Sequence, residues 1–239
     1  MNIAGIVKTS CIDFPGRLSA VVFTPGCNYD CPYCHNRHLL GRPRPVLDEG
    51  EVRYFLRKRA GMLDGVAVSG GEPTLQKDLC EFLAYAKGLG YETKLDTNGS
   101  RPDVIKQVLD LKLADYIAVD YKAPWDSYQS VCGGDASMVE ETFRLLLGSD
   151  TVWEARTTVF AGLMPDDLNK MAEEAPVLPL YFLQYCREPL FDQTDTTLKS
   201  TSAIAYPETE LAAIASSLRA VQPNIRVRGG VMNVSKSIV

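Results

Sequence analysis

Short apolar runs alternate with amphipathic segments along most of this chain. The apolar runs are rich in β-branched residues and predict six strands, within residues 17–26, 65–73, 91–99, 115–122, 152–160 and 178–186. The segments between them repeat apolar residues at helical spacing, and in residues 75–90 one face of the predicted helix carries Leu75, Leu79, Phe82, Leu83 and Ala86. Strands that alternate with helices in this way predict a parallel sheet with right-handed crossovers.

Six strand–helix units are too few for a closed eight-stranded barrel. We therefore expect an α/β fold in which a partial (βα)6 barrel of parallel strands is flanked by helices. A further helix and a short strand are predicted within residues 207–230, and a single domain is expected over residues 1–239, with its core at about 17–185. In such folds the chemistry lies beyond the carboxyl ends of the strands, so the residues that follow each strand are the first site candidates.

Composition narrows the classes of function. The hydrophobic content of 46% and charged content of 23% are ordinary for a globular protein, and the net charge of −5 argues against a nucleic-acid surface. The sequence has no apolar run of about 18 residues, as a membrane helix requires, and its first residues carry no export signal. We therefore expect a cytoplasmic protein without membrane or nucleic-acid partners, whose seven cysteines stay reduced.

Three cysteines and a histidine lie within nine positions directly after the first predicted strand, in the stretch GCNYDCPYCHNR. Four interpretations compete: buried thiols in a turn, a c-type haem attached through Cys-x2-Cys-His, a zinc site, or a [4Fe–4S] cluster on three thiolates. Haem attachment is typical of exported proteins, and zinc usually takes ligand pairs from separate segments, whereas His35 is adjacent to Cys34. The spacing Cys-x3-Cys-x2-Cys, with Tyr33 before the last cysteine, favours the cluster, in which three thiolates leave one iron open.

This spacing, together with the stretch SGGEP that ends the second predicted strand, resembles the radical S-adenosylmethionine (SAM) enzymes. The resemblance implies that Cys27, Cys31 and Cys34 are the catalytic residues and metal ligands of a [4Fe–4S] cluster whose open iron binds SAM. One-electron reduction then splits SAM into methionine and a 5′-deoxyadenosyl radical that abstracts hydrogen. Residues 36–63 contain no cysteine, so we expect one cluster.

The resemblance also assigns one half of a SAM pocket. Gly70 and Gly71 allow a ligand close to the backbone, and Glu72 supplies a carboxylate for the SAM ammonium. Tyr33 and His35 flank the last cysteine, where relatives meet the adenine largely through main-chain groups. The alternatives are a strand-ending turn for the glycine pair and packing beneath the loop for Tyr33.

The other half follows the third and fourth predicted strands. The stretches DTNG and DYK resemble segments of pyruvate formate-lyase activase, in which Asp96, Thr97, Asp120 and the Ala118 carbonyl correspond to a monovalent-cation site beside the SAM carboxylate. Lys122 is expected to pair with that carboxylate. An Asn-Gly turn and a solvated lysine are the alternatives.

One departure from that relative matters. Its histidine at the end of the sixth strand is replaced here by the stretch LQYCRE, so the candidates for a SAM contact, none of which is assigned, are Gln184, Tyr185 and Arg187. Cysteines outside the motif are expected to be buried thiols rather than ligands, namely Cys11, Cys80, Cys132 and Cys186.

Residues 10–36, SCIDFPGRLSAVVFTPGCNYDCPYCHN, most resemble glycyl-radical enzyme activases, in particular those of anaerobic ribonucleoside-triphosphate reductase. The implied partners are that reductase and a flavodoxin or ferredoxin as electron donor. Asp13 either holds the target peptide or belongs to a plain turn, and the basic residues 53–59 either dock the donor or form a solvated helix face. The alternatives are a radical SAM enzyme acting on a small molecule, such as a deazapurine-forming synthase, and a non-catalytic metal or iron–sulfur module.

Overall fold

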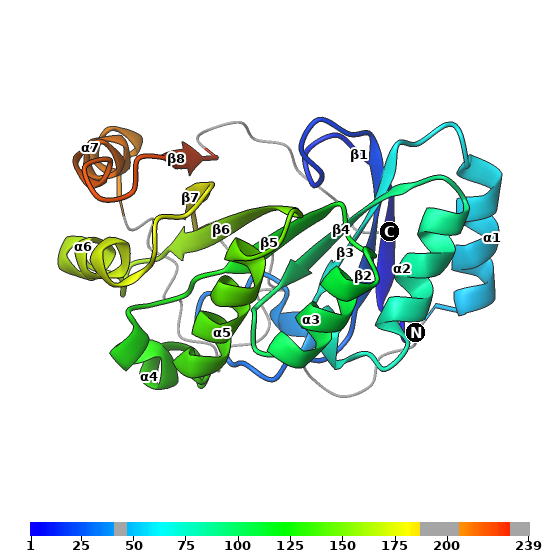
Figure 1. Ribbon diagram of the computed structural model, residues 1–239, viewed down its shortest axis with the longest axis horizontal. Helices are drawn as coiled ribbons and strands as arrows, with labels where there is room; N and C mark the ends of the chain where they lie inside the picture. The colour runs from blue at the N-terminus through cyan, green and yellow to red at the C-terminus, as the bar shows by residue number, and fades with distance from the viewer. Residues whose placement is uncertain (41–46, 187–205, 230–239) are drawn as a thin grey trace, which may run out of the picture.

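The computed structural model describes residues 1–40, 47–186 and 206–229. One sheet runs through it, and its strands follow chain order: β1 (Gly5–Ser10), β2 (Ser19–Thr24), β3 (Gly65–Gly70), β4 (Glu92–Thr97), β5 (Tyr116–Asp120), β6 (Val152–Val159), β7 (Tyr181–Tyr185) and β8 (Ile225–Arg228) (Figure 1). Strand β1 is antiparallel to β2, and every later pair of neighbours is parallel. The predicted open α/β sheet is confirmed, because β1 and β8 form its two edges.

Strand β1 is the strand that the sequence pattern did not predict. It pairs with β2 through Gly5 opposite Phe23 and Val7 opposite Val21. Lys8 and Thr9 near its end are exposed, so the segment lacks the continuous apolar run of the buried parallel strands. Charged and polar residues on an edge strand discourage further pairing, which explains why the pattern was weak here.

The helices connect the parallel strands and begin close to the predicted positions. They are α1 (Glu49–Arg59), α2 (Leu79–Gly88), α3 (Pro102–Asp110), α4 (Tyr128–Cys132), α5 (Ala136–Leu147), α6 (Pro165–Glu174) and α7 (Glu208–Leu218), with 3-10 turns η1 (Arg37–Leu39), η2 (Pro73–Leu75) and η3 (Trp125–Ser127). Leu75, predicted on the face of α2, lies instead in the turn η2 that precedes the helix. In the part of the chain that the structure describes, no helix is both long and apolar enough to cross a membrane.

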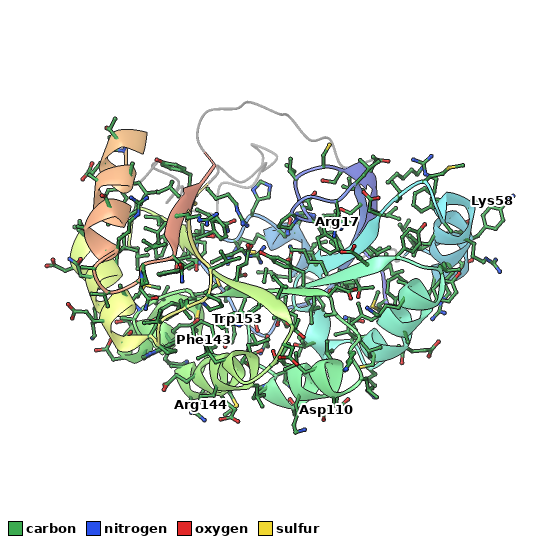
Figure 2. All side chains as sticks on the ribbon, turned by 45° about the horizontal axis from the view of Figure 1, so that its top comes forward. Arg17, Lys58, Asp110, Phe143, Arg144 and Trp153 are labelled. Carbon is green, nitrogen blue, oxygen red and sulfur yellow. The ribbon has the colours of Figure 1, made fainter. Side chains whose placement is uncertain are left out.

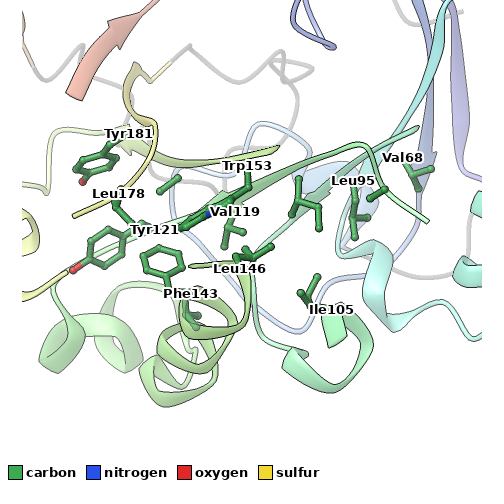
Figure 3. Packing of buried hydrophobic residues seen from close by; sticks show 14 of the residues in the cluster. Val68, Leu95, Ile105, Val119, Tyr121, Phe143, Leu146, Trp153, Leu178 and Tyr181 are labelled. Carbon is green, nitrogen blue, oxygen red and sulfur yellow. The ribbon is translucent and has the colours of Figure 1, made fainter. Parts of the chain in front are cut away.

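The two faces of the sheet differ in character, because successive side chains of a strand point to opposite faces. On β5, Ile117 and Val119 are fully buried in the main core, where Phe143 of α5 also packs, between the sheet and the helices (Figure 3). Full burial of a side chain of this size stabilises the fold by roughly 1.5–3 kcal/mol. The alternate residues Ala118 and Asp120 belong to the opposite face, where most of the chemistry described below is found.

The stretch Asp13–Gly16 lies at the amino ends of the parallel strands, away from the cysteine loop that leaves the carboxyl end of β2. Phe14 is buried, its ring centroid lies 6.1 Å from that of Tyr116, and a Cβ on Gly65 would lie 2.9 Å from its ring. A turn closes behind it, since the Arg17 amide donates to the Phe14 carbonyl at 3.1 Å. Of the two interpretations of this stretch, the structure supports the turn.

Candidate active site

The three motif cysteines lie in one loop whose ends are tied together. The Gly26 amide donates to the Leu39 carbonyl at 2.9 Å, which closes the loop where it leaves β2. Inside the loop, Arg37 donates to the Cys31 carbonyl at 3.1 Å and pairs with Asp30 at 2.8 Å. Cys31 is buried, and the other two motif cysteines are half-buried. The fold therefore holds three thiols in a short, internally bonded loop at the carboxyl end of the sheet.

The hydrogen bonds to Cys27 are of the kind that a cluster thiolate accepts, although no three His, Cys, Asp or Glu side chains in the described part of the chain are placed to hold a single metal ion. The Cys27 sulfur accepts hydrogen bonds from the Tyr29 amide at 3.4 Å and from Asn98 Nδ2 at 3.7 Å, the kind of donors that stabilise cluster thiolates. Burial raises the pKa of the Cys27 thiol to about 11, so this thiol stays protonated near neutral pH unless a metal binds its thiolate. His35 is exposed whereas Cys31 is buried, so the histidine does not share the environment of the buried thiol.

Two tyrosines of the loop have buried hydroxyls. The hydroxyls of Tyr29 and Tyr33 are buried without a hydrogen-bond partner among the described residues. The Tyr33 ring stacks on Phe160 at the end of β6, with the centroids 4.4 Å apart. The Tyr33 side chain lies beside Cys31 and helps to lower the pKa of that thiol. The Tyr29 hydroxyl packs against Gly134, where an added Cβ would lie 2.8 Å away.

The glycine pair after β3 is required by the chain itself. A Cβ on Gly71 would lie 1.9 Å from the Gly26 carbonyl oxygen, and one on Gly70 would lie 2.4 Å from the Thr24 backbone. Gly70 also has a φ of 120°, which other residues rarely adopt. The amides of Gly71 and Glu72 donate to the carbonyls of Thr24 and Gly26 at 2.9 and 2.8 Å. The two glycines thus bring the base of the cysteine loop against the end of β3.

Glu72 is fully buried and joins two strand ends. Its Oε1 accepts hydrogen bonds from the Thr74 amide at 3.0 Å, the Thr74 hydroxyl at 2.5 Å and the Thr97 hydroxyl at 2.7 Å. Its Oε2 accepts from the Asn98 amide at 2.6 Å. Burial raises the pKa of this carboxyl, and the four donors oppose that effect because they favour the charged form. Oε2 has one hydrogen bond and therefore keeps capacity for a second donor.

A second group of charged residues, here named the charge cluster, consists of Lys94, Asp96, Asp120, Lys122 and Arg156. Arg156 lies between the two carboxylates, 3.3 Å from Asp96 and 2.9 Å from Asp120. Lys94 pairs with Asp96, and Lys122 pairs with Asp120 at 3.1 Å. Burial acts to raise the pKa values of Asp96 and Asp120. The basic neighbours outweigh this effect and hold the pKa values of both aspartates below their ordinary range.

The charge cluster does not fit the monovalent-cation site implied by the sequence resemblance. Both aspartates are already neutralised by three basic side chains, and Arg156 fills the space between them. The Thr97 hydroxyl, a predicted ligand, donates to Glu72. Arg156 and Lys94 were not among the predicted site residues. Each lies two positions from an acidic residue inside a predicted strand, so the pair shares one face of the sheet, and this spacing is the sequence feature that could have indicated the cluster.

The remaining cysteines differ from one another. Cys132 is buried at the end of α4, and its thiol donates to the Tyr128 carbonyl at 3.2 Å. Cys132 also lies beside Cys31, and this neighbour is the main cause that lowers the pKa of Cys31. Cys11 is exposed and Cys80 is half-buried, so the expectation of buried thiols is correct for Cys132 and wrong for Cys11. Cys132 was not predicted to contact the loop, because the short helix α4 that carries it was not predicted.

The end of β7 adds no assigned residue. Gln184 lies opposite Thr158 of β6 and Arg228 of β8, and Tyr185 lies opposite Val159. Arg187 lies outside the described residues. Cys186 is half-buried at the same strand end.

Comparison with known proteins defines the class. Residues 21–175 match the Radical SAM superfamily, and this stretch is more than half of the chain. The chain therefore belongs to the radical SAM superfamily. Its class is accordingly that of enzymes that use a [4Fe–4S] cluster and SAM, as the cysteine spacing predicted.

More particular similarities lie within that superfamily. The chain is 35% identical over 194 residues to the Methanocaldococcus jannaschii protein named "Putative glycyl-radical enzyme activating enzyme", covering 76% of this chain and 78% of that protein. It is 27% identical over 229 residues to the pyruvate formate-lyase-activating enzyme of Listeria monocytogenes, covering 87% and 91%. A solved structure, "Native anSMEcpe with bound AdoMet", superimposes with a TM-score of 0.62 at 18% identity, covering 84% of this chain and 61% of the other. At that identity the likeness shows the fold alone.

Proposed function

We propose that this protein is a radical SAM activase that generates a glycyl radical on a partner enzyme, using one cluster held by Cys27, Cys31 and Cys34. The observation that carries the proposal is the similarity to activating enzymes, which extends over most of the length of both chains compared. When bound together, the cluster and SAM supply a one-electron cleavage that yields a carbon radical able to take hydrogen from a glycine Cα.

The residues around the loop have distinct roles in this proposal. Glu72 accepts the SAM ammonium at Oε2, which has one hydrogen bond among the described residues. Lys122 carries its ammonium 3.1 Å from Asp120 and pairs with the SAM carboxylate. Tyr33 and His35, on either side of Cys34, line the adenine side, where the Tyr33 ring is fixed by its stacking on Phe160. Gly70 and Gly71 act indirectly, because they hold the base of the cysteine loop in place.

The partner that we propose is the anaerobic ribonucleoside-triphosphate reductase, in the cytoplasm. The support is the resemblance of residues 10–36 to the activases of that enzyme. Phe14 and its turn lie at the amino ends of the strands, so we do not assign Asp13 to the target peptide. The target glycine must instead reach the carboxyl ends, where closure by the partner would exclude water.

A flavodoxin or ferredoxin is the electron donor that we propose. The basic residues 53–59 at the end of α1 do not support a docking site near the cluster. Helix α1 leads into the amino end of β3, and Arg59 lies within 3.5 Å of the Thr9 hydroxyl in β1. Lys58, labelled in Figure 2, projects from the outside of α1. These residues therefore form a solvated helix face at the end of the sheet opposite the cysteine loop.

The test is anaerobic reconstitution followed by reaction with the reductase, SAM and a strong reductant. Wild-type protein should bind about four irons, consistent with one cluster, and should leave a persistent glycyl doublet on the reductase in electron paramagnetic resonance. The variants Cys27→Ala, Cys31→Ala and Cys34→Ala should lose both signals. Cys80→Ala is the matched control, because Cys80 lies on α2 outside the loop.

Two outcomes would overturn parts of the proposal. Loss of the cluster in Cys132→Ala would contradict the three-ligand assignment, since its thiol adjoins Cys31. Formation of 5′-deoxyadenosine without a radical on any glycyl-radical enzyme would contradict the activase function and favour a small-molecule substrate.

A further inference from the structure

The charge cluster is arranged so that one basic side chain serves both carboxylates. Asp96 is the last residue but one of β4, before Thr97, and in the sheet it pairs with Ala118 of β5. Asp120 ends β5 and pairs directly with Arg156 of β6. Because side chains at alternate positions share a face, Asp96, Asp120 and Arg156 project from three adjacent strands onto the same face of the sheet.

Arg156 is the member that joins the two aspartates. Its Nη1 lies 3.3 Å from Asp96 Oδ1, while its Nη2 and Nε lie 2.9 and 3.1 Å from Asp120 Oδ1. The arginine side chain is 13% exposed and that of Asp96 is 16% exposed. A planar guanidinium with several donors can bridge two carboxylates in this way, whereas a lysine contacts them as a point charge.

The balance of charge leaves no demand for a further cation. The cluster holds three basic and two acidic side chains, and the neighbouring pair of Glu154 and Arg228 adds one charge of each sign. The group therefore carries one positive charge more than negative charges. Lys94 is 3% exposed and pairs with the same Asp96 oxygen that faces Arg156. A Na⁺ or K⁺ ion placed between the aspartates would meet three basic side chains in a setting where Asp96 is 16% and Asp120 31% exposed, so repulsion between like charges opposes its binding.

We propose that Arg156, assisted by Lys94, replaces an external monovalent cation in this chain. Arg156 is a positioning residue: it fixes Asp96 and Asp120, and through Asp120 it orients Lys122 toward the carboxyl ends of the strands. The surplus positive charge of the cluster is then available to an anionic group such as a carboxylate. The stability of this protein should consequently be the same in Na⁺, K⁺ and an organic cation at equal ionic strength.

The experiment compares thermal unfolding of the full-length protein, without cluster or SAM, in NaCl, KCl and choline chloride. Wild-type protein should unfold at the same temperature in all three salts. Arg156→Gln removes the bridging charge, so this variant should be least stable in choline chloride and should regain stability with Na⁺ or K⁺ in a saturable manner, as expected for an ion that binds only the folded state. Arg156→Lys should need less rescue than Arg156→Gln.

Arg144→Gln is the matched control, because it removes the same charge from a side chain that is 65% exposed on α5. Its unfolding temperature should not depend on the cation. A wild-type protein that is stabilised by Na⁺ or K⁺ over choline would overturn the proposal whether or not the variants fold. An Arg156→Gln variant with equal stability in all three salts would overturn it as well. None of these readouts needs a glycyl-radical partner, so their outcome is independent of the proposed function.

SAM affinity of the reconstituted protein gives a second readout. In choline chloride, Arg156→Gln should bind SAM at least tenfold more weakly than wild type, and KCl or NaCl should restore part of the loss. Wild-type affinity in all three salts for this variant would contradict the positioning role of Arg156.

Discussion

Replacing Glu72 with glutamine tests whether the buried carboxylate joins the ends of β3 and β4. The carboxylate accepts four hydrogen bonds, three at Oε1 and one at Oε2. A glutamine amide offers one oxygen. If that oxygen takes the place of Oε1, the amide nitrogen faces the Asn98 N–H, and one hydrogen bond to a charged acceptor, of about 1.5–3 kcal/mol, is lost. The other three bonds weaken because the acceptor is neutral.

Relief of the buried charge offsets part of this loss, so we expect Glu72→Gln to lower the free energy of unfolding by about 2 kcal/mol. In a chain of this length the unfolding temperature should fall by roughly 4–8 °C. Urea unfolding of the cluster-free protein, followed by circular dichroism, would measure the change. Glu81→Gln is the control, because Glu81 is 72% exposed and its pair with Arg53 contributes little. Equal stability of the two variants would refute the assigned role of Glu72.

Three further substitutions address other parts of the site and fold. Asn98→Ala removes the hydrogen bond from Asn98 Nδ2 to the Cys27 sulfur. With Cys27 as the proposed cluster ligand, this change should lower the reduction potential of the cluster, and an unchanged midpoint in a redox titration would count against that contact. Arg228→Met removes the bidentate partner of the fully buried Glu154, whose two oxygens lie 2.5 and 2.6 Å from the guanidinium. It should lower the free energy of unfolding in urea by about 3 kcal/mol. A decrease below about 1 kcal/mol would show that the pair contributes little to stability. Gly71→Ala should destabilise the protein by more than about 2 kcal/mol and reduce its iron content. Gly88 has open space around it, so Gly88→Ala should be neutral or stabilising. Equal stability and iron content in the two variants would contradict the close approach of the loop to Gly71.

Strands β2, β3, β5 and β7 could be predicted because each is a short, mostly apolar run bounded by turn residues. In β6 apolar and polar residues partly alternate, and β4 was indicated by Leu95 between two β-branched threonines. The carboxyl ends of parallel strands lie at the same end of a sheet. For this reason the sequence alone could place Glu72, Asp96 and Asp120 near one another. The edge strand β1 and the five-residue helix α4 (Tyr128–Cys132) were missed, since neither is long enough or apolar enough to leave a periodic signal.

Contacts between side chains distant in sequence could not be predicted. The packing of α4 brings the thiol of Cys132 beside Cys31. Arg156 of β6 contacts Asp96 of β4 across the strand β5 that lies between them. The glycine pair shows a related limit: the sequence indicated a close backbone approach, but the group that approaches Gly71 is the Gly26 carbonyl of the same chain. A glycine pair indicates that another group lies close to the backbone, but only the structure identifies that group.

Isotope transfer tests the central claim, that this protein takes hydrogen from a glycine Cα of a partner enzyme. The ribonucleotide reductase partner would be produced with α-deuterated glycine and mixed anaerobically with the reconstituted protein, SAM and reductant. Mass spectrometry would then measure the 5′-deoxyadenosine formed. We expect this 5′-deoxyadenosine to carry one deuterium, and its amount to equal the amount of glycyl radical formed on the partner. Unlabelled 5′-deoxyadenosine, formed together with that radical, would contradict direct abstraction from glycine.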